Sequence, residues 1–456
     1  MAPGDVDVAL EAQIAEWRTY LRRRRAIHDV DVAELEDHLR GQLESLTATG
    51  LSGDEAFLVA VKRMGAVDAL SQEFAREHSD RLWRQLMATP GAAEEGSAGR
   101  RREAAVALSL AIVAGVLIKL PELFGQFLQT HPAFYLRNAS LAVFPVVAGY
   151  FAWKRGLTGR TIGTLAIAFV VAALAINLPS FRTGGDTERL AALHLPIALW
   201  GVVGVAYVGG RWWRGGRRMD FVRFSGELFI YFVLIALGGA VLTMFTMGIF
   251  ASIGADAEWF VERWLVPCGA AGAVVVASWL VEAKQSVIEN IAPVLSRLFT
   301  PLFAALLVTF LATMAWTGRG IHIERNVLIA FDVLLALVLG LLLYAISARD
   351  PDAPAGGSDW LLVFLVVSAL LVDGLALAAI VARISDFGFT PNRVAALGEN
   401  VILLVNLAGS AWLYGRFLRG RGSFRALEEW QTGYLPIYAA WAALVVVLFP
   451  PLFGYR

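Results

Sequence analysis

The sequence of 456 residues contains one cysteine, Cys268, and equal numbers of acidic and basic residues, 39 of each. A lone cysteine excludes an intrachain disulfide and a metal site built from several cysteines. A net charge of zero gives no overall field that attracts polyanions, so no nucleic-acid partner is expected. The chain also lacks Gly-x-Ser-x-Gly, His-Glu-x-x-His and phosphate-binding glycine motifs. We therefore assign no catalytic residue, no metal and no cofactor, and nothing indicates an enzyme.

Charged residues are scarce as well. They make up 17% of the chain, whereas 57% of the residues are hydrophobic and the mean hydropathy is +0.60. Soluble domains contain about 25% charged residues, and an apolar stretch of about 20 residues crosses the bilayer core as a helix. The sequence predicts an all-α fold, a polytopic membrane bundle of about 11 helices surrounded by lipid. The expected spans lie near residues 104–121, 139–153, 161–179, 191–210, 225–251, 263–282, 298–316, 326–347, 359–382, 396–415 and 434–454.

The distribution of basic residues predicts how the chain crosses the membrane. No long apolar stretch precedes residue 100, so we expect the first span to act as the insertion signal. Arg100, Arg101 and Arg102 stand directly before that span, which places the N-terminus in the cytosol and the C-terminus outside. The loops expected outside are poorer in Lys and Arg than the others; they are 122–138, 180–190, 252–262, 317–325 and 383–395.

The first 88 residues have the periodicity of a small cytosolic helical bundle, and a flexible linker is expected over 89–103. Ser52 and Glu55 have the spacing of a capping box, and Gly65 is expected to end the helix that follows. The stretch LEDHLRGQLESLTATGLSGDEAFLVAVKRMG, with the following VDALSQEF, resembles the permease prefix domain found ahead of some bacterial permeases. The resemblance implies a cytosolic accessory module that contacts a protein partner, without catalytic residues.

One acid stands near the middle of the most apolar part of the chain. Asp373 lies in WLLVFLVVSALLVDGLALAAIVA, the span from Trp360 to Ala382. A charge near the bilayer centre costs about 2.5–3.5 kcal/mol, so such a residue is a candidate functional site. The alternative is a neutral or hydrogen-bonded Asp373 that only holds neighbouring helices together. Both interpretations stay open at this point.

The tenth expected span is unusually polar and supplies the expected neighbours of Asp373. Asn406 lies at a matching depth and is the expected hydrogen-bond partner, and Glu399 lies seven residues earlier on the same helical face. A weak repeat adds the supporting charges Arg325 and Arg393, because each Arg is followed seven residues later by a polar residue. His194 is interpreted as a hydrogen-bonded helix residue. The candidate substrate or ion pathway comprises Asp373, Asn406, Glu399, Asn400 and Asp332.

Two segments of the membrane region resemble a bacterial multi-pass family designated domain of unknown function 4153. They are GRGIHIERNVLIAFDVLLALVLG and DFGFTPNRVAALGENVILLVNLAGSAWLY. The resemblance implies an all-helical protein of the bacterial cytoplasmic (inner) membrane, with no assigned activity.

Two functions are compatible with these features. The first is a transporter or permease in which Asp373 binds a proton or cation within a polar network. The second is a membrane-anchored scaffold or signalling protein whose residues 1–88 bind a protein partner. A homo-oligomer is compatible with either.

Overall fold

The computed structural model describes residues 10–11, 13–18, 29–48, 50–65, 92–182, 184–212, 217–252, 256–283, 291–317 and 325–455, and all regular structure in these ranges is helical. The chain divides into two compact units, Met1–Arg101 and Arg102–Arg456. The boundary falls inside the expected linker 89–103, and helix α5 begins within that segment, at Ala92. The expected all-α class is thus present in the described residues.

The N-terminal unit contains helices α2 (Asp29–Ala48) and α3 (Gly53–Gly65), and residues 13–18 are also helical. Trp17, Leu39 and Phe57 pack in its hydrophobic core. Ser52 donates from its backbone N–H and its hydroxyl to Glu55 at 3.0 and 2.8 Å, and α3 ends at Gly65 as expected. The part of the expected bundle that follows Gly65, up to residue 88, lies outside the described residues. The complete bundle and its protein partner stay predictions.

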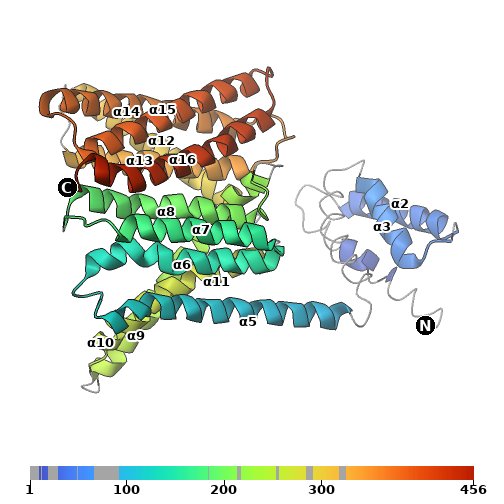
Figure 1. Ribbon diagram of the computed structural model, residues 1–456. Coiled ribbons are helices and arrows are strands. Elements are labelled where there is room, and N and C mark those ends of the chain that lie inside the picture. Colours follow the sequence, from blue (N-terminus) through green and yellow to red (C-terminus); the bar gives the residue numbers. More distant parts are fainter. Residues whose placement is uncertain are drawn as a thin grey trace. The chain divides into compact units, whose positions relative to one another are not determined.

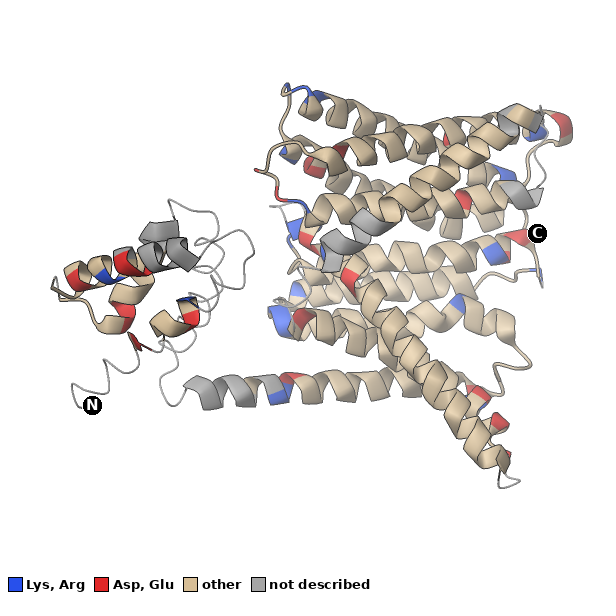
Figure 2. Ribbon diagram, turned by 180° about the vertical axis from the view of Figure 1, so that it is seen from behind, with Lys and Arg blue, Asp and Glu red and all other residues tan. Residues whose placement is uncertain are grey.

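The second unit consists of long helices joined by short connections, most of them side by side with roughly aligned axes, whereas α9 and α10 run obliquely (Figure 1). Charged residues gather mainly near the helix ends (Figure 2). The elements are α5 (Ala92–Lys119), a 3-10 helix (Leu120–Phe124), α6 (Pro132–Arg155), α7 (Gly159–Asn177), α8 (Asp186–Tyr207), α9 (Arg217–Ser252), α10 (Glu258–Phe260), a π-helical turn (Val261–Leu265), α11 (Val266–Ala283), α12 (Ile291–Thr317), α13 (Arg325–Ala348), α14 (Gly357–Phe387), α15 (Pro391–Leu418) and α16 (Phe424–Leu452).

The exterior of this unit suits a lipid bilayer. Nine helices of the described residues are long and apolar enough to cross a membrane. Large apolar side chains such as Ile112, Ile167 and Leu242 are exposed on them, as expected where lipid rather than water is the neighbour. The chain is therefore a multi-pass membrane protein. Helices α6 and α12 lie where two more spans are expected, and the count of eleven, like the sidedness, stays a prediction.

Two hydrophobic clusters divide the membrane unit. The first cluster joins α5–α8 with α11, and the second joins α12–α15. Helices α9 and α16 contribute to both, so they connect the two groups. Below, α5–α8 with α11 are called the first helix group and α12–α15 the second helix group. Any movement between the groups would act on the contacts of α8 with α15 and α16 and of α9 with α13.

The packing of α15 against α16 fixes the direction of the polar residues on α15. The Trp441 ring lies directly over Gly398, and the Trp430 ring lies over Gly409, so neither glycine has room for a Cβ atom. These contacts hold α15 at one rotation relative to α16. The rotation in turn determines which neighbour each polar side chain of α15 meets.

Candidate functional site

Asp373 lies deep in the second helix group. It stands fourteen residues before Phe387, the last residue of α14, and is therefore roughly 21 Å from that end of the helix. Its exposed fraction is 0%, and neither of its carboxyl oxygens accepts a hydrogen bond from the described residues. Most buried polar groups in proteins have a hydrogen-bond partner. Asp373 is therefore an exception that calls for an explanation.

Two other polar residues of the predicted set, Asp332 of α13 and Asn400 of α15, come together in the second helix group. The Asn400 Nδ2 group donates to Asp332 Oδ1 at 2.9 Å and to the Ala396 carbonyl oxygen at 2.8 Å. The Asp332 carboxylate is close enough for its charge to act on Asp373. The Asn400 Oδ1 atom is buried and accepts no hydrogen bond from any described residue. Asp373, Asp332 and Asn400 are called the acidic cluster below; it contains three buried oxygen atoms without a donor.

The expected hydrogen bond between Asp373 and Asn406 is wrong. Asn406 instead exchanges hydrogen bonds with Gln431 of α16, at 3.2 and 3.3 Å between the amide groups. Gln431 Nε2 also donates to Ser410 Oγ at 2.6 Å. The physical reason is helical phase: six residues separate Asn400 from Asn406, so their side chains point roughly 120° apart around the axis of α15. Asn406, Gln431 and Ser410 are called the amide cluster below.

Glu399 faces the first helix group. Its Oε1 atom lies 2.6 Å from His194 Nε2 of α8, and His194 Nδ1 lies 2.8 Å from the Leu190 carbonyl oxygen. The backbone contact agrees with the interpretation of His194 as a hydrogen-bonded helix residue, but the ion pair with Glu399 was missed. A signal for it exists in the sequence. Each residue stands eight positions after the start of its helix, and both helices are expected to start at the same side of the membrane.

Of the two arginines assigned as supporting charges, Arg393 has a described side chain, and this side chain donates no hydrogen bond to Asp373. Arg393 Nη1 donates to the carbonyl oxygens of Phe387 and Gly388 at 3.0 and 2.7 Å. Its guanidinium therefore caps the C-terminal end of α14, where cations are favourable. The side chain of Arg325 lies outside the described residues.

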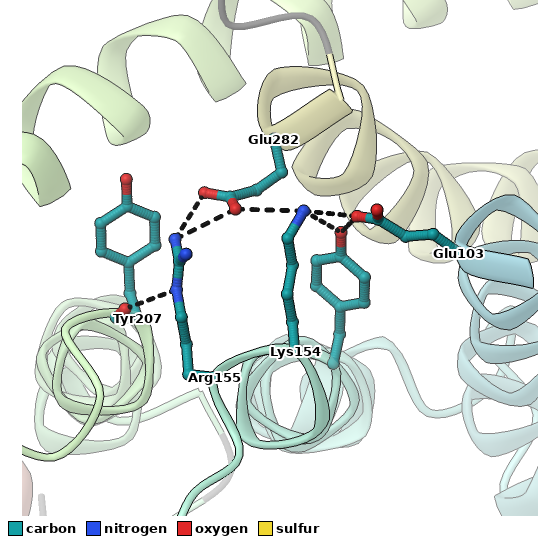
Figure 3. Close-up of polar contacts among 6 residues, drawn as sticks. Glu103, Lys154, Arg155, Tyr207 and Glu282 are labelled. Atoms are coloured by element: carbon teal, nitrogen blue, oxygen red, sulfur yellow. Dashed lines mark hydrogen bonds and ion pairs between the residues drawn. The ribbon is translucent and has the colours of Figure 1, made fainter. Parts of the chain in front are cut away.

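A second polar centre lies at the other end of the bundle and was not predicted as a site. Figure 3 shows Glu282 of α11 between Lys154 and Arg155 of α6. Arg155 Nη2 donates to both Glu282 oxygens at 2.9 and 3.0 Å, and Lys154 Nζ lies 3.2 Å from Glu282 Oε2. Lys154 and the Tyr150 hydroxyl also donate to Glu103 of α5. These contacts join three helices of the first helix group, α5, α6 and α11.

A cavity of about 380 Å³ opens beside this ionic network. Acidic and basic residues are balanced in its wall, and Arg155 and Arg223 are already bonded, to Glu282 and to the Ser347 carbonyl oxygen. The balance favours neither anions nor cations, so we assign no ligand to it. Its lining residues are Arg155, Tyr207, Arg217, Asp220, Arg223, Phe224, Glu227, Val281 and Glu282.

Among the described residues, no group of three or more His, Cys, Asp and Glu side chains could hold a metal ion. Comparison with family models, curated proteins and solved structures found no match for the chain. The resemblances to the permease prefix domain and to the domain of unknown function 4153 therefore stay predictions.

Proposed function

We propose that the membrane unit is a permease-like transporter in which Asp373 binds the coupling ion, a proton or a monovalent cation. The observation that carries the proposal is the complete burial of Asp373, whose carboxyl oxygens have no hydrogen-bond donor within the described parts of the chain. In membrane proteins, such acids are expensive and typically belong to ion pathways. The resemblance of residues 35–74 to a permease prefix domain points in the same direction.

The energetics support an ion-binding role over a purely structural one. A buried carboxylate without a donor loses its hydration and gains no interaction in return, which costs several kcal/mol. This conformation therefore accommodates Asp373 best as the neutral acid, with a proton bound. A residue that only joined helices would gain its stabilising effect from a hydrogen bond to a neighbour. The amide cluster has such bonds, whereas Asp373 has none.

The positions of the neighbouring polar residues support a route to Asp373. Asp332 stands seven residues after the start of α13, and Glu399 stands eight residues after the start of α15. Glu399 is partly accessible, with 32% of its side chain exposed, and its charge acts on Asp332. Asp373 lies deeper than both. A proton entering at Glu399 would therefore meet Asp332 and Asn400 before Asp373.

The test is ion movement in proteoliposomes. A proton or sodium gradient is imposed across vesicles that contain the full chain, and internal pH and solute uptake are followed with a panel of small metabolites. The Asp373→Asn variant should lose about 100-fold of the ion movement, the usual scale for removing a proton-transfer group. Asp352→Asn is the matched control, because the Asp352 side chain is 78% exposed. Equal ion movement by Asp373→Asn and the wild type, or none by the wild type, would overturn the proposal.

A further inference from the structure

The contact between His194 and Glu399 joins the two helix groups. His194 belongs to α8 of the first helix group, and Glu399 belongs to α15 of the second helix group. The His194 side chain is 9% exposed. The contact lies roughly 12 Å from the starts of both helices, at the end of the bundle that the sequence predicts to be outside.

The two hydrogen bonds of the ring determine where its protons are. The Leu190 carbonyl oxygen can only accept, so His194 Nδ1 must carry a hydrogen to bond it at 2.8 Å. Nε2 of a neutral ring of this tautomer is an acceptor, and it lies 2.6 Å from Glu399 Oε1. A hydrogen bond over that distance requires one proton between the two atoms, either on the imidazole or on the carboxyl group.

We infer that His194 and Glu399 form a proton-binding site whose single shared proton holds α8 against α15. With the proton present, the contact is a short charge-assisted hydrogen bond. When the proton leaves, the Nε2 lone pair faces a carboxylate, and the contact becomes repulsive. Proton release should therefore part the helices at this end. The role of this event in transport rests on the function proposed above, whereas proton binding by the pair does not.

No other described side chain competes with Glu399 for the His194 ring. The elements packed against α8 are α6, α7, α9, α15 and α16, and among their described side chains only Glu399 bonds the His194 ring. The nearby charges are engaged elsewhere. Glu188 pairs with Arg137 of α6 at 3.4 Å, Arg393 caps α14, and Asp332 accepts from Asn400.

The polar contacts at the opposite end differ in chemistry. There, Arg223 of α9 donates to the Ser347 carbonyl oxygen of α13, and Arg218 of α9 donates to the Thr432 carbonyl oxygen of α16. Arginine stays charged and backbone carbonyls do not titrate, so these bonds do not respond to protons in the physiological range. Proton release should thus loosen the His194 end of the bundle while the arginine end stays closed.

The experiment measures the separation of α8 and α15 in the full chain in lipid nanodiscs. Spin labels are attached through Arg189→Cys and Phe389→Cys, in a Cys268→Ala background, and the distance between the labels is read by pulsed electron resonance. The distance should increase by several ångströms when the pH is raised from about 5 to about 9, values on either side of the usual histidine range. No transported solute is needed, so failure here is distinguishable from failure of the transport assay.

Two variants separate a proton-binding link from ordinary packing. Glu399→Gln should keep the short distance at both pH values, because the amide can donate to neutral Nε2 and accept from protonated Nε2. His194→Ala should show the long distance at both values. A wild-type distance that does not change with pH, or a Glu399→Gln distance that changes as the wild type does, would overturn the inference.

Discussion

The amide cluster is fully buried, the acidic cluster is buried except for the partly exposed Asp332, and both clusters include a residue of α15. In the amide cluster, Asn406, Gln431 and Ser410 satisfy one another over 2.6–3.3 Å. In the acidic cluster, neither carboxyl oxygen of Asp373 has a donor in the part of the chain that the structure describes, whereas Asp332 and Asn400 are bonded to each other. We interpret this difference in hydrogen bonding as a difference in the roles of the two clusters. Reciprocal amides stabilise the packing of two helices, whereas an acid without partners retains the capacity to bind an ion.

The largest expected effect is the loss of ion movement when Asp373 of the acidic cluster is replaced. Asp373→Asn should reduce ion movement about 100-fold, yet it should leave the thermal unfolding midpoint unchanged or raise it, because no hydrogen bond is lost. Ion movement is measured in proteoliposomes, and unfolding is followed in the same preparation. A large drop in the unfolding midpoint would mean that Asp373 stabilises the bundle, and the contrast with the amide cluster would disappear.

Glu282 is a buried acid that, unlike Asp373, is bonded to cations. Glu282 is almost fully buried between Lys154 and Arg155, so Glu282→Gln removes the carboxylate that Arg155 binds and leaves Lys154 with Glu103 as its only anionic partner among the described residues. We expect a loss of about 2 kcal/mol in the free energy of unfolding, which is reduced by the partial exposure of the two cations. Chemical denaturation in mixed micelles measures the loss. Glu262→Gln is the control, since Glu262 is exposed. Equal stability of both variants would contradict the prediction.

The amide cluster itself should respond through stability alone. Asn406→Leu leaves the buried Gln431 Oε1 atom without its donor, although Gln431 Nε2 still donates to Ser410, and we expect a loss of about 1–2 kcal/mol in the free energy of unfolding. The double variant Asn406→Leu with Gln431→Leu should recover part of that loss, because no unpaired amide remains. Ion movement per folded molecule should stay close to that of the wild type. A specific loss of ion movement in Asn406→Leu would assign the amide cluster to the pathway.

The smallest effect is expected at an exposed polar contact of the N-terminal unit. The hydrogen bonds from Ser52 lower the pKa of Glu55 below its usual value. The contact therefore stabilises α3 above the usual glutamate range, near pH 4.3, and the contribution is lost as the pH falls through the lowered pKa. Hydrogen exchange of the full chain should show faster exchange at the start of α3 in Glu55→Gln at neutral pH. The two proteins should converge at low pH; a difference that persists there would contradict the assignment.

Hydropathy alone predicted the nine described helices that are long and apolar enough to cross a membrane. The depth of Asp373 and the shared helical face of Glu399 and Asn406 also follow from spacing alone. The identity of their partners does not, because it depends on the rotation of α15, which Gly398 and Gly409 determine through their contacts with tryptophans of α16. Asn406 therefore meets Gln431 rather than Asp373. Glu282 was overlooked because acids near the ends of spans are common and its partners lie on another helix.

Infrared difference spectroscopy tests the central claim most directly. The carbonyl stretching region of the wild type at neutral pH is compared with that of Asp373→Asn, with Asp352→Asn as the control. We predict a band of a protonated carboxylic acid in the wild type and in Asp352→Asn that is missing from Asp373→Asn. Identical spectra of the three proteins in that region would show that Asp373 is not held with a bound proton, and would contradict the account.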